Sequence, residues 1–394
     1  MARSPAFAGR FCIVVGDVLK ALGDLAHFWR DRQAAKVVAI TGSNGKTTTK
    51  EMTARILCGG FRVLKTEGNL NNLIGLPLIL LRLSPEHDVA VLEMGMSESG
   101  EVRRLKEISN PQVSTITNIG SAHLEFLESL EGVARAKGEL WENLGAGDRI
   151  AVNLDDPRVE KLAAPARCLK MTFSLLREAD VQGSGLTLET EGKVRFFLAM
   201  GSLRRRVALA TYGRHNVYNA LAAAAMAASL GVDLDGIAEG LEGFRPIPGR
   251  GKILLLKRGV RILDESYNCN PDSLEATLAA FIEMKGKNPG ILVLGDMLEL
   301  GSLSFEMHEK AGRRLGLLGF KNLFFLGEQA QRLAEGAKTS GMNGQKILAT
   351  QNVGEVLDGL EKAVGEGDWV LVKGSRGMRL ERIIEGLGDY LGRI

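Results

Sequence analysis

The sequence predicts an α/β fold in which a central domain with a mostly parallel sheet is followed by a smaller α/β domain. Three observations lead to this prediction. The chain has 394 residues, which is more than one hydrophobic core usually supports. Short β-branched runs alternate with amphipathic helical segments in its first half, and the alternation returns in its last third. Such alternation is typical of parallel sheets that carry helices on both faces.

The composition is that of an ordinary globular protein, with 45% hydrophobic and 25% charged residues. The 50 basic and 47 acidic residues form no long single-sign run, so we predict no nucleic-acid binding. Four scattered cysteines without a CxxC pair argue against zinc sites and disulfide scaffolds. The longest apolar stretch, 221–230, is about half a membrane span, and the N-terminal FCIVV run is too short for a signal peptide. We therefore expect a cytoplasmic protein with no membrane segment.

The central domain is predicted over residues 34–248. A helix is expected at 46–57, directly after a strand and a glycine-rich turn. The segment 181–210 alternates polar and apolar residues, which indicates antiparallel strands added to the sheet, and an alanine-rich helix follows at 217–230. The parallel strands, short buried runs that end in small and polar residues, are predicted at 37–40, 89–92 and 113–119.

The C-terminal domain is predicted over residues 249–394. It begins at the string FRPIPGRGK, where prolines and glycines interrupt the chain, and new strands are expected from Ile253 and Val260. Further strands, separated by helices, are predicted at 291–294, 323–326 and 369–372. This order predicts a compact Rossmann-like domain.

The clearest chemical signal is the string AITGSNGKTTTKE at 39–51, between a predicted strand and a predicted helix. Gly42 and Gly45 would let backbone amides turn inward around phosphate oxygens, and the helix start adds partial positive charge. Lys46 would reach the terminal phosphates, and Thr47 offers a hydroxyl to Mg²⁺. The spacing GxxGKT is shorter than the common GxxxxGK[ST], so an incidental glycine-rich turn is the alternative. The flanking strand and helix favour a P-loop domain that binds nucleotide.

Three further residues are candidates for the same edge of the sheet. Glu93 ends the second predicted strand, where an acid can hold a magnesium ion or can simply be solvated. The string TNIGSAHLEF brings His123 to this edge, although a lone histidine is often a capping or packing group. Lys137, in ARAKGELW, reads by itself as an ordinary helix lysine.

Taken together, the strings of this chain resemble the Mur ligase family of peptidoglycan synthesis, from about Leu19 to the C-terminus. The resemblance is carried by TGSNGKTTTKE, EGNLNNLIGLP, VLEMGMSESGE, TNIGSAHLEFLES, ARAKGELWENL, GRHNVYNALAAAA, PIPGRGK, LDESYNCNP, LGDMLELG and VKGSRGM. SYNCNPDS, GDMLELG and VKGSRGM are most similar to the members that add D-alanyl-D-alanine to UDP-N-acetylmuramoyl-tripeptide. The resemblance implies that ATP phosphorylates the tripeptide's carboxylate and that the dipeptide amine then attacks the acyl phosphate, releasing ADP and phosphate. We expect a monomer.

The resemblance also implies the roles of the residues around the phosphates. The phosphate cradle would comprise Gly42, Ser43, Asn44, Gly45, Lys46, Thr47 and Thr48. Thr47 and Glu93 would lie near one Mg²⁺ ion, and His123 would serve a second. Lys137 matches a lysine that carbon dioxide carbamylates in this family. The modification would turn a cation that metal ions repel into an anionic ligand.

Further roles follow from the same resemblance. Asn219 would face the adenine, Arg250 would contact phosphate from between the domains, and Asp264 and Glu265 would lie near the ribose. The family usually has aspartate where Glu265 stands. The positions that would line the acyl-substrate cleft are Asn69 and Asn72. The candidates for the dipeptide pocket are Asn268, Asn270, Lys373 and Arg376.

The N-terminus departs from the family pattern. Family members begin with a separate domain for the uridine nucleotide, and residues 1–33 resemble only its tail and the linker helix. We therefore expect most of that domain to be missing, through a natural shortening, a late start codon or trimming. The alternatives to the ligase are a folylpolyglutamate- or cyanophycin-type amide ligase, an ATP-binding member without full ligase activity, and a plain P-loop ATPase.

Overall fold

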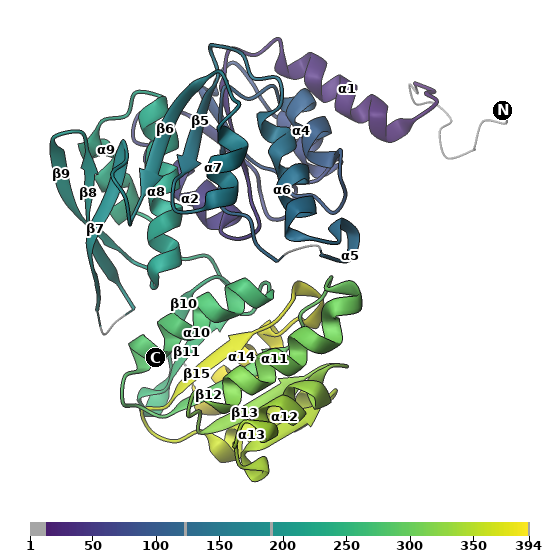
Figure 1. The fold of residues 1–394 in the computed structure, drawn as a ribbon, viewed down its shortest axis with the longest axis vertical. Coiled ribbons are helices and arrows are strands. Elements are labelled where there is room, and N and C mark those ends of the chain that lie inside the picture. The colour runs from purple at the N-terminus through teal and green to yellow at the C-terminus, as the bar shows by residue number, and fades with distance from the viewer. Residues whose placement is uncertain (1–12, 122–123, 190–191, 393–394) are drawn as a thin grey trace.

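The computed structural model describes residues 13–121, 124–189 and 192–392. Two sheets with their helices lie one above the other, joined by residues 243–251 (Figure 1). The fold is α/β, as the sequence predicts. The exact division into domains at 33/34 and 248/249 stays a prediction.

The first sheet has nine strands in the order β2-β3-β1-β4-β5-β6-β7-β8-β9. Neighbours from β2 to β7 are parallel, and β7, β8 and β9 are antiparallel. The strands are β1 Lys36–Thr41, β2 Val63–Lys65, β3 Val89–Glu93, β4 Val113–Ile116, β5 Arg149–Asn153, β6 Leu169–Ser174, β7 Val181–Leu188, β8 Val194–Met200 and β9 Leu203–Leu209. The strand predicted at 113–119 ends early, because Thr117 and the residues after it turn toward the phosphate loop.

Two hydrophobic cores lie on opposite faces of this sheet. One packs α2, α8 and α9 against it, and the other packs α1, α3, α4, α6 and α7. The helices are α1 Val18–Arg30, α2 Lys46–Leu57, α3 Gly75–Leu80, α4 Glu101–Ser109, α5 Leu124–Leu127, α6 Leu130–Gly138, α7 Pro157–Ala163, α8 Arg214–Ser229 and α9 Leu234–Glu242. The alanine-rich α8 is buried along most of its length, since its small side chains allow close packing against α2 and the sheet.

The second sheet has six strands in the order β10-β11-β15-β12-β13-β14, all parallel except β10. The strands are β10 Lys252–Leu255, β11 Arg261–Glu265, β12 Gly290–Gly295, β13 Asn322–Leu326, β14 Ile347–Thr350 and β15 Trp369–Lys373. The α-helices that accompany them in the described part of the chain are α10 Pro271–Lys285, α11 Ser304–Gly316, α12 Ala330–Thr339, α13 Val353–Ala363 and α14 Glu381–Leu391.

The connection between the two sheets contains a turn at Gly249 and Gly251 that is hydrogen-bonded to Asp264. Gly249 and Gly251 have φ angles of 79° and 80°, a region that favours glycine. The Gly249 amide donates to Asp264 Oδ2 at 2.7 Å, and the Gly251 amide donates to the Asp264 carbonyl at 2.8 Å. The chain is thereby turned so that Arg250 lies between the sheets.

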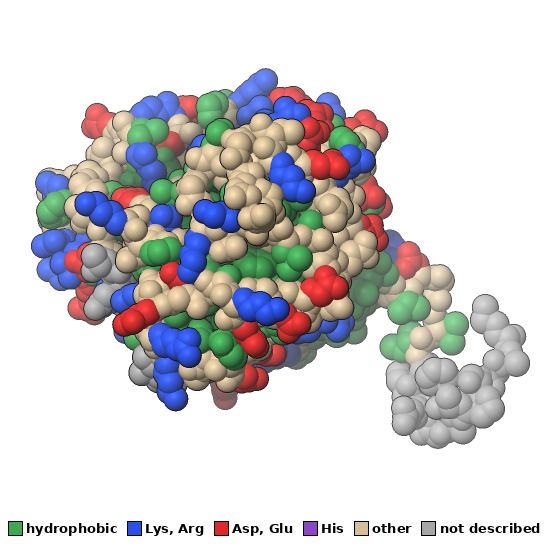
Figure 2. All heavy atoms as spheres, turned by 90° about the horizontal axis from the view of Figure 1, so that it is seen from below, with side chains coloured by type: hydrophobic (Ala, Val, Ile, Leu, Met, Phe, Trp, Pro, Cys, Tyr) green, Lys and Arg blue, Asp and Glu red, His purple; other side chains and the backbone are tan. Residues whose placement is uncertain are grey.

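No helix in the described part of the chain combines the length and apolarity needed to cross a bilayer. On the face seen in Figure 2, basic and acidic side chains are interspersed with polar and apolar ones. That face therefore has mixed charge, and the prediction of no nucleic-acid partner stays a prediction.

Candidate functional site between the two sheets

The phosphate loop connects β1 to α2 and requires glycine at two positions. Gly42 and Gly45 have φ angles of 145° and 81°. A Cβ atom on Gly42 would lie 1.9 Å from Thr117 Oγ1, and one on Gly45 would lie 2.1 Å from Asn219 Oδ1. Larger residues would thus clash at both positions. The loop is therefore shaped by its glycines, as the sequence predicts.

Residues after β4 hold the loop in place. The Asn44 amide donates to Asn118 Oδ1 at 3.0 Å, and Thr117 Oγ1 donates to the Asn44 carbonyl at 2.6 Å. Ser43 Oγ bonds with both the carbonyl and the amide of Gly120. Sequence reasoning missed Thr117 and Asn118, although their place just beyond the end of a parallel strand is where such residues are expected.

Lys46 lies at the first turn of α2. Its Nζ donates to the Gly42 carbonyl at 2.7 Å and the Ser43 carbonyl at 3.3 Å, so the ammonium folds over the loop. Burial lowers the pKa of Lys46, and the positive charge of Arg250 lowers it further. The negative charge of Glu93 acts in the opposite direction and raises the pKa. A phosphate group would replace the two carbonyls with a stronger partner.

Glu93 ends β3 and is 3% exposed. Asn71 Nδ2 donates to its Oε1 at 2.9 Å, whereas Oε2 is buried without a hydrogen-bond partner among the described residues. A buried carboxylate oxygen in this state carries a large desolvation penalty that a cation would relieve. This one oxygen is therefore suited to a cation, and Asn71, which sequence reasoning missed, orients the Glu93 carboxylate.

Lys137, in α6, is 1% exposed. Burial, reinforced by the positive charge of Lys46, puts its pKa well below the usual lysine value. A neutral buried amine is the form that reacts with carbon dioxide. His123 lies outside the described residues. Among the described residues, those of this site included, no three or more His, Cys, Asp or Glu side chains form a metal-binding group.

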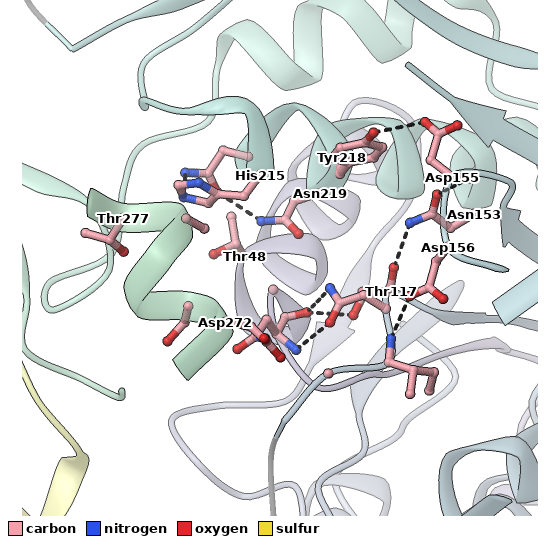
Figure 3. A pocket seen from close by; sticks show the side chains of 18 of the residues that line it. Thr48, Thr117, Asn153, Asp155, Asp156, His215, Tyr218, Asn219, Asp272 and Thr277 are labelled. Carbon is pink, nitrogen blue, oxygen red and sulfur yellow. Dashed lines mark hydrogen bonds between the residues drawn. The ribbon is translucent and has the colours of Figure 1, made fainter. Parts of the chain in front are cut away.

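The larger cavity of the site, about 500 Å³, lies between the sheets and is shown in Figure 3. Helix α8 contributes Asn219, whose Nδ2 donates to Asn216 Oδ1 at 3.0 Å and whose Oδ1 accepts from Thr49 Oγ1 at 3.3 Å. Tyr218 Oη donates to Asp155 at 3.0 Å on the far wall. The size and the mixture of polar groups suit a nucleoside.

The second sheet closes this cavity from the other side. Asp272, at the start of α10, accepts from the Ser121 amide at 2.5 Å, and Thr277 lies further along the same helix (Figure 3). Glu265 also lines the cavity and accepts from Tyr212 Oη at 2.5 Å. The neighbouring Asp264 is not among the lining residues; its carboxylate accepts from Gly249 and Ser266. For Asp264, the geometry favours a structural role at the turn.

Two smaller cavities continue from the first. One of about 90 Å³ is lined by Lys46, Thr47 and Glu93, and one of about 330 Å³ is lined by Asn69 and its neighbours. Arg250 lines all three cavities, and its guanidinium stacks on the Tyr267 ring at 3.9 Å. The three cavities thus neighbour one another around Arg250, with the phosphate loop lining the larger and the smallest of them.

The remaining predicted substrate residues lie in different settings. Asn72 Oδ1 accepts from the Gly75 amide at 2.8 Å at the start of α3. Lys373 is buried, and its Nζ lies 3.3 Å from Glu265 Oε2 and 3.1 Å from the Asn268 carbonyl. Lys373 and Asn72 thus have local structural partners, and their predicted substrate contacts stay predictions.

Asn270 and Arg376 lie at the boundary of the site. Asn270 caps α10 and donates from Nδ2 to Asn44 Oδ1 at 2.8 Å, which ties the second sheet to the phosphate loop. Arg376 lines the cavity that contains Asn69 and pairs with Glu381 at 2.9 Å. Asn268 is exposed and lines the smallest cavity.

A phosphate loop lies at the edge of a parallel sheet, and the second sheet closes a cavity next to it. These features define the class of nucleotide-binding α/β proteins. Residues 40–227 match the model of the Mur ligase middle domain, and residues 249–376 match that of the Mur ligase, glutamate ligase domain. The chain belongs to the Mur ligase family.

Individual relatives are similar along almost the whole chain. The UDP-N-acetylmuramoyl-tripeptide–D-alanyl-D-alanine ligase of Bacillus subtilis is 34% identical over 375 residues, which cover 95% of this chain and 80% of that protein. A crystal structure of MurF from Acinetobacter baumannii has a TM-score of 0.88 at 34% identity and covers 96% of this chain and 82% of its own. The MurF ligase from Thermotoga maritima in complex with ADP has a TM-score of 0.85 at 28% identity, covering 96% and 85%. The prediction that most of an N-terminal domain is missing is not supported by these alignments.

Proposed function

We propose that this chain is an ATP-dependent ligase that joins D-alanyl-D-alanine to UDP-N-acetylmuramoyl-tripeptide in peptidoglycan precursor synthesis. Relatives at 34% identity include a ligase named for this reaction and a MurF structure. The observation that supports the proposal is the set of three neighbouring cavities that Arg250 lines. We assign the largest of the three to the nucleoside, the smallest to the phosphates and the one lined by Asn69 to the acceptor. We further propose that the enzyme acts in the cytoplasm as a monomer.

The first chemical step in this proposal transfers the γ-phosphoryl group of ATP to the carboxylate of the tripeptide. The nucleoside would occupy the larger cavity, near Asn219 and Glu265, and the carboxylate would approach from the cavity lined by Asn69. Lys46 and Arg250 would offset the negative charge that spreads over the transferred group. Positioning and charge supply most of the catalysis in such transfers.

Magnesium ions, when bound, would supply further positive charge to the phosphates. Glu93 Oε2, the Thr47 hydroxyl and His123 are the groups that we propose to hold them. Lys137 would join them as a carbamate, formed when its neutral amine adds to carbon dioxide and loses a proton. Its depressed pKa supports this proposal, because an ordinary lysine would be protonated and unreactive.

In the second step the dipeptide amine attacks the acyl phosphate carbon, an amide bond forms and phosphate leaves. Water must be kept out, since it would hydrolyse the acyl phosphate. We propose that residues 246–251 act as a hinge that lets the second sheet close over the site. Asn268, Asn270, Lys373 and Arg376 stay candidates for the dipeptide pocket.

The substrate dependence of phosphate release tests the proposed function. ATP and magnesium are supplied with the UDP-linked tripeptide and D-alanyl-D-alanine, separately and together. The proposal predicts sustained release and a pentapeptide product only when both are present. Equal release without the dipeptide would identify an ATPase, and ATP binding without turnover would identify a nucleotide-binding member that lacks ligase activity.

A further inference from the structure

Helix α2 carries a second lysine, Lys50, one turn beyond Lys46. Lys50 is 1% exposed and is among the largest fully buried side chains of the described chain. Residues four apart lie on the same face of a helix, so Lys50 follows Lys46 by about 6 Å along the helix axis. Burial of an ammonium is costly unless its charge and its N–H groups find partners. The contacts of Lys50 therefore indicate what compensates this cost.

Two of the N–H groups of Lys50 have partners in the protein. Its Nζ donates to the Thr66 carbonyl at 2.7 Å and lies 2.9 Å from Glu51 Oε1. Glu51 also pairs with Lys65, so two lysines share one carboxylate. A lysine ammonium has three N–H groups. The third one has no acceptor among the described residues.

Lys50 lines the cavity that we assign to the acceptor. This cavity of about 330 Å³ is also lined by Asn69, Arg250 and Arg376. Lys50 is not among the described residues that line the other two cavities, whereas Thr47 lines both the acceptor cavity and the smallest one. The buried ammonium thus lies on the acceptor side of the phosphate site and not on the nucleoside side.

The charged side chains around this cavity leave an excess of positive charge. Lys50, Arg250 and Arg376 are its cations, and Glu51 is the one acid among the described residues that line it. Arg376 pairs with Glu381, which leaves Lys50 and Arg250 facing a single carboxylate. The attraction of such cations for an anion grows as water is excluded. A ligand that enters this cavity as a carboxylate would balance the excess charge.

We propose that Lys50 binds the terminal carboxylate of the acceptor tripeptide through its third N–H group. One carboxylate oxygen accepts from Lys50, and the other attacks the γ-phosphorus of ATP. The new O–P bond forms as the bond from phosphorus to the ADP oxygen breaks. This inference rests on the proposed ligase function.

The same contact would also serve the second step. In the acyl phosphate, the oxygen that Lys50 holds is the carbonyl oxygen. When the neutral amine of the dipeptide adds to the carbonyl carbon, negative charge develops on this oxygen, and the ammonium stabilises it. The C–O bond to phosphate then breaks, and one amine proton leaves with the phosphate as HPO₄²⁻. Lys50 therefore contacts the reacting group in both steps.

A comparison of two ligands tests the inference with the full chain. The ligands are the UDP-linked tripeptide and its terminal carboxamide, which lacks the negative charge, and their affinities are measured by calorimetry without ATP. Lys50→Met removes the ammonium and keeps an apolar side chain of similar length. We expect the unsubstituted protein to prefer the carboxylate, and this preference to fall about 10-fold or more in Lys50→Met, as for the loss of a charged hydrogen bond. The affinity for ATP should be unchanged.

Lys50→Gln keeps the test available if the methionine variant is unstable. Glutamine can still donate to the Thr66 carbonyl but carries no charge, so the preference for the carboxylate should fall to a similar extent. Lys65→Met is the matched control, because Lys65 pairs with the same Glu51 and is not among the described residues that line the acceptor cavity. The control should retain the full preference.

Three results would overturn the inference. Equal weakening of both ligands in Lys50→Met would assign Lys50 to the placement of the chain at Thr66. An unchanged preference in Lys50→Met would show that the carboxylate binds elsewhere. A similar loss of preference in Lys65→Met would show that the charge of Glu51 accounts for the effect. If the unsubstituted protein binds neither ligand, the proposed function itself fails, which is a distinct result.

Discussion

A Glu93→Gln variant is expected to lose about 10²–10³-fold in acyl phosphate formation, the usual effect of removing one preorganised charge-stabilising group. Glutamine retains an oxygen for Asn71 but removes the negative charge that we propose to hold magnesium. The loss should be smaller at high magnesium concentration, because mass action compensates for weaker binding. Added hydroxylamine traps the acyl phosphate as a hydroxamate. The measurement is the rate at which this hydroxamate forms from ATP and the tripeptide as a function of magnesium concentration.

The thermal stability of the metal-free protein should not fall in this variant, although its activity does. Glu93 Oε2 is buried and lacks a hydrogen-bond partner within the described residues, so the metal-free protein bears the desolvation cost of this oxygen. We expect the Tm of the metal-free Glu93→Gln variant to be equal to or above that of the unsubstituted protein. Glu67→Gln, which alters an exposed acid paired with Arg82, is the control and should change neither quantity. Full activity of Glu93→Gln at low magnesium would contradict the assigned role.

A Lys137→Ala variant is expected to lose about 10²–10³-fold in dipeptide ligation and to be partly rescued by short carboxylic acids. Lys137 is almost fully buried in α6, so alanine leaves a space in the interior where the lysine side chain lies. A small carboxylate that enters this space would replace the carbamate's negative oxygens. The measurement is the rate of dipeptide ligation with and without added formate or acetate.

The unsubstituted protein offers a second readout for Lys137. Burial and the charge of Lys46 keep its pKa well below the usual lysine value, which favours the neutral, reactive amine. Removal of carbon dioxide from the buffer should therefore lower activity, and bicarbonate should restore it. Lys161→Ala, which alters an exposed helix lysine, is the control and should respond to carbon dioxide as the unsubstituted protein does. Lys137→Ala activity that is unaffected, or that no carboxylate restores, would exclude the carbamate.

Much of the fold could be predicted from the sequence because its periodic signals are strong. The predicted helix at 46–57 coincides with α2, since the glycine-rich turn and the following helix formers mark its start. Strands with continuous apolar runs, such as β12 and β15, were also predictable. The strands β2, β5, β6 and β14 were missed. β2 and β14 are short, and β6 has exposed residues at its start. These three strands therefore show no clear alternation or run of apolar residues.

Site residues could be proposed from the sequence where a motif indicates the chemistry, and not where only tertiary contacts bring residues together. A phosphate loop is predicted by the spacing of Gly42, Gly45 and Lys46. Asn71 and Asn118 act through contacts with residues about 20 and 70 positions away, which no local pattern contains. Likewise, a motif position such as Asp264 does not reveal whether its carboxylate faces a cavity or holds its own turn.

The transfer of oxygen from substrate to phosphate tests the central claim most directly. The tripeptide is prepared with ¹⁸O in its terminal carboxylate and is incubated with ATP, magnesium, D-alanyl-D-alanine and the protein. If an acyl phosphate forms, one labelled oxygen leaves with each released phosphate and the other stays in the new amide. Phosphate that carries no label while ATP is consumed would show that water is the acceptor, and the ligase assignment would be wrong.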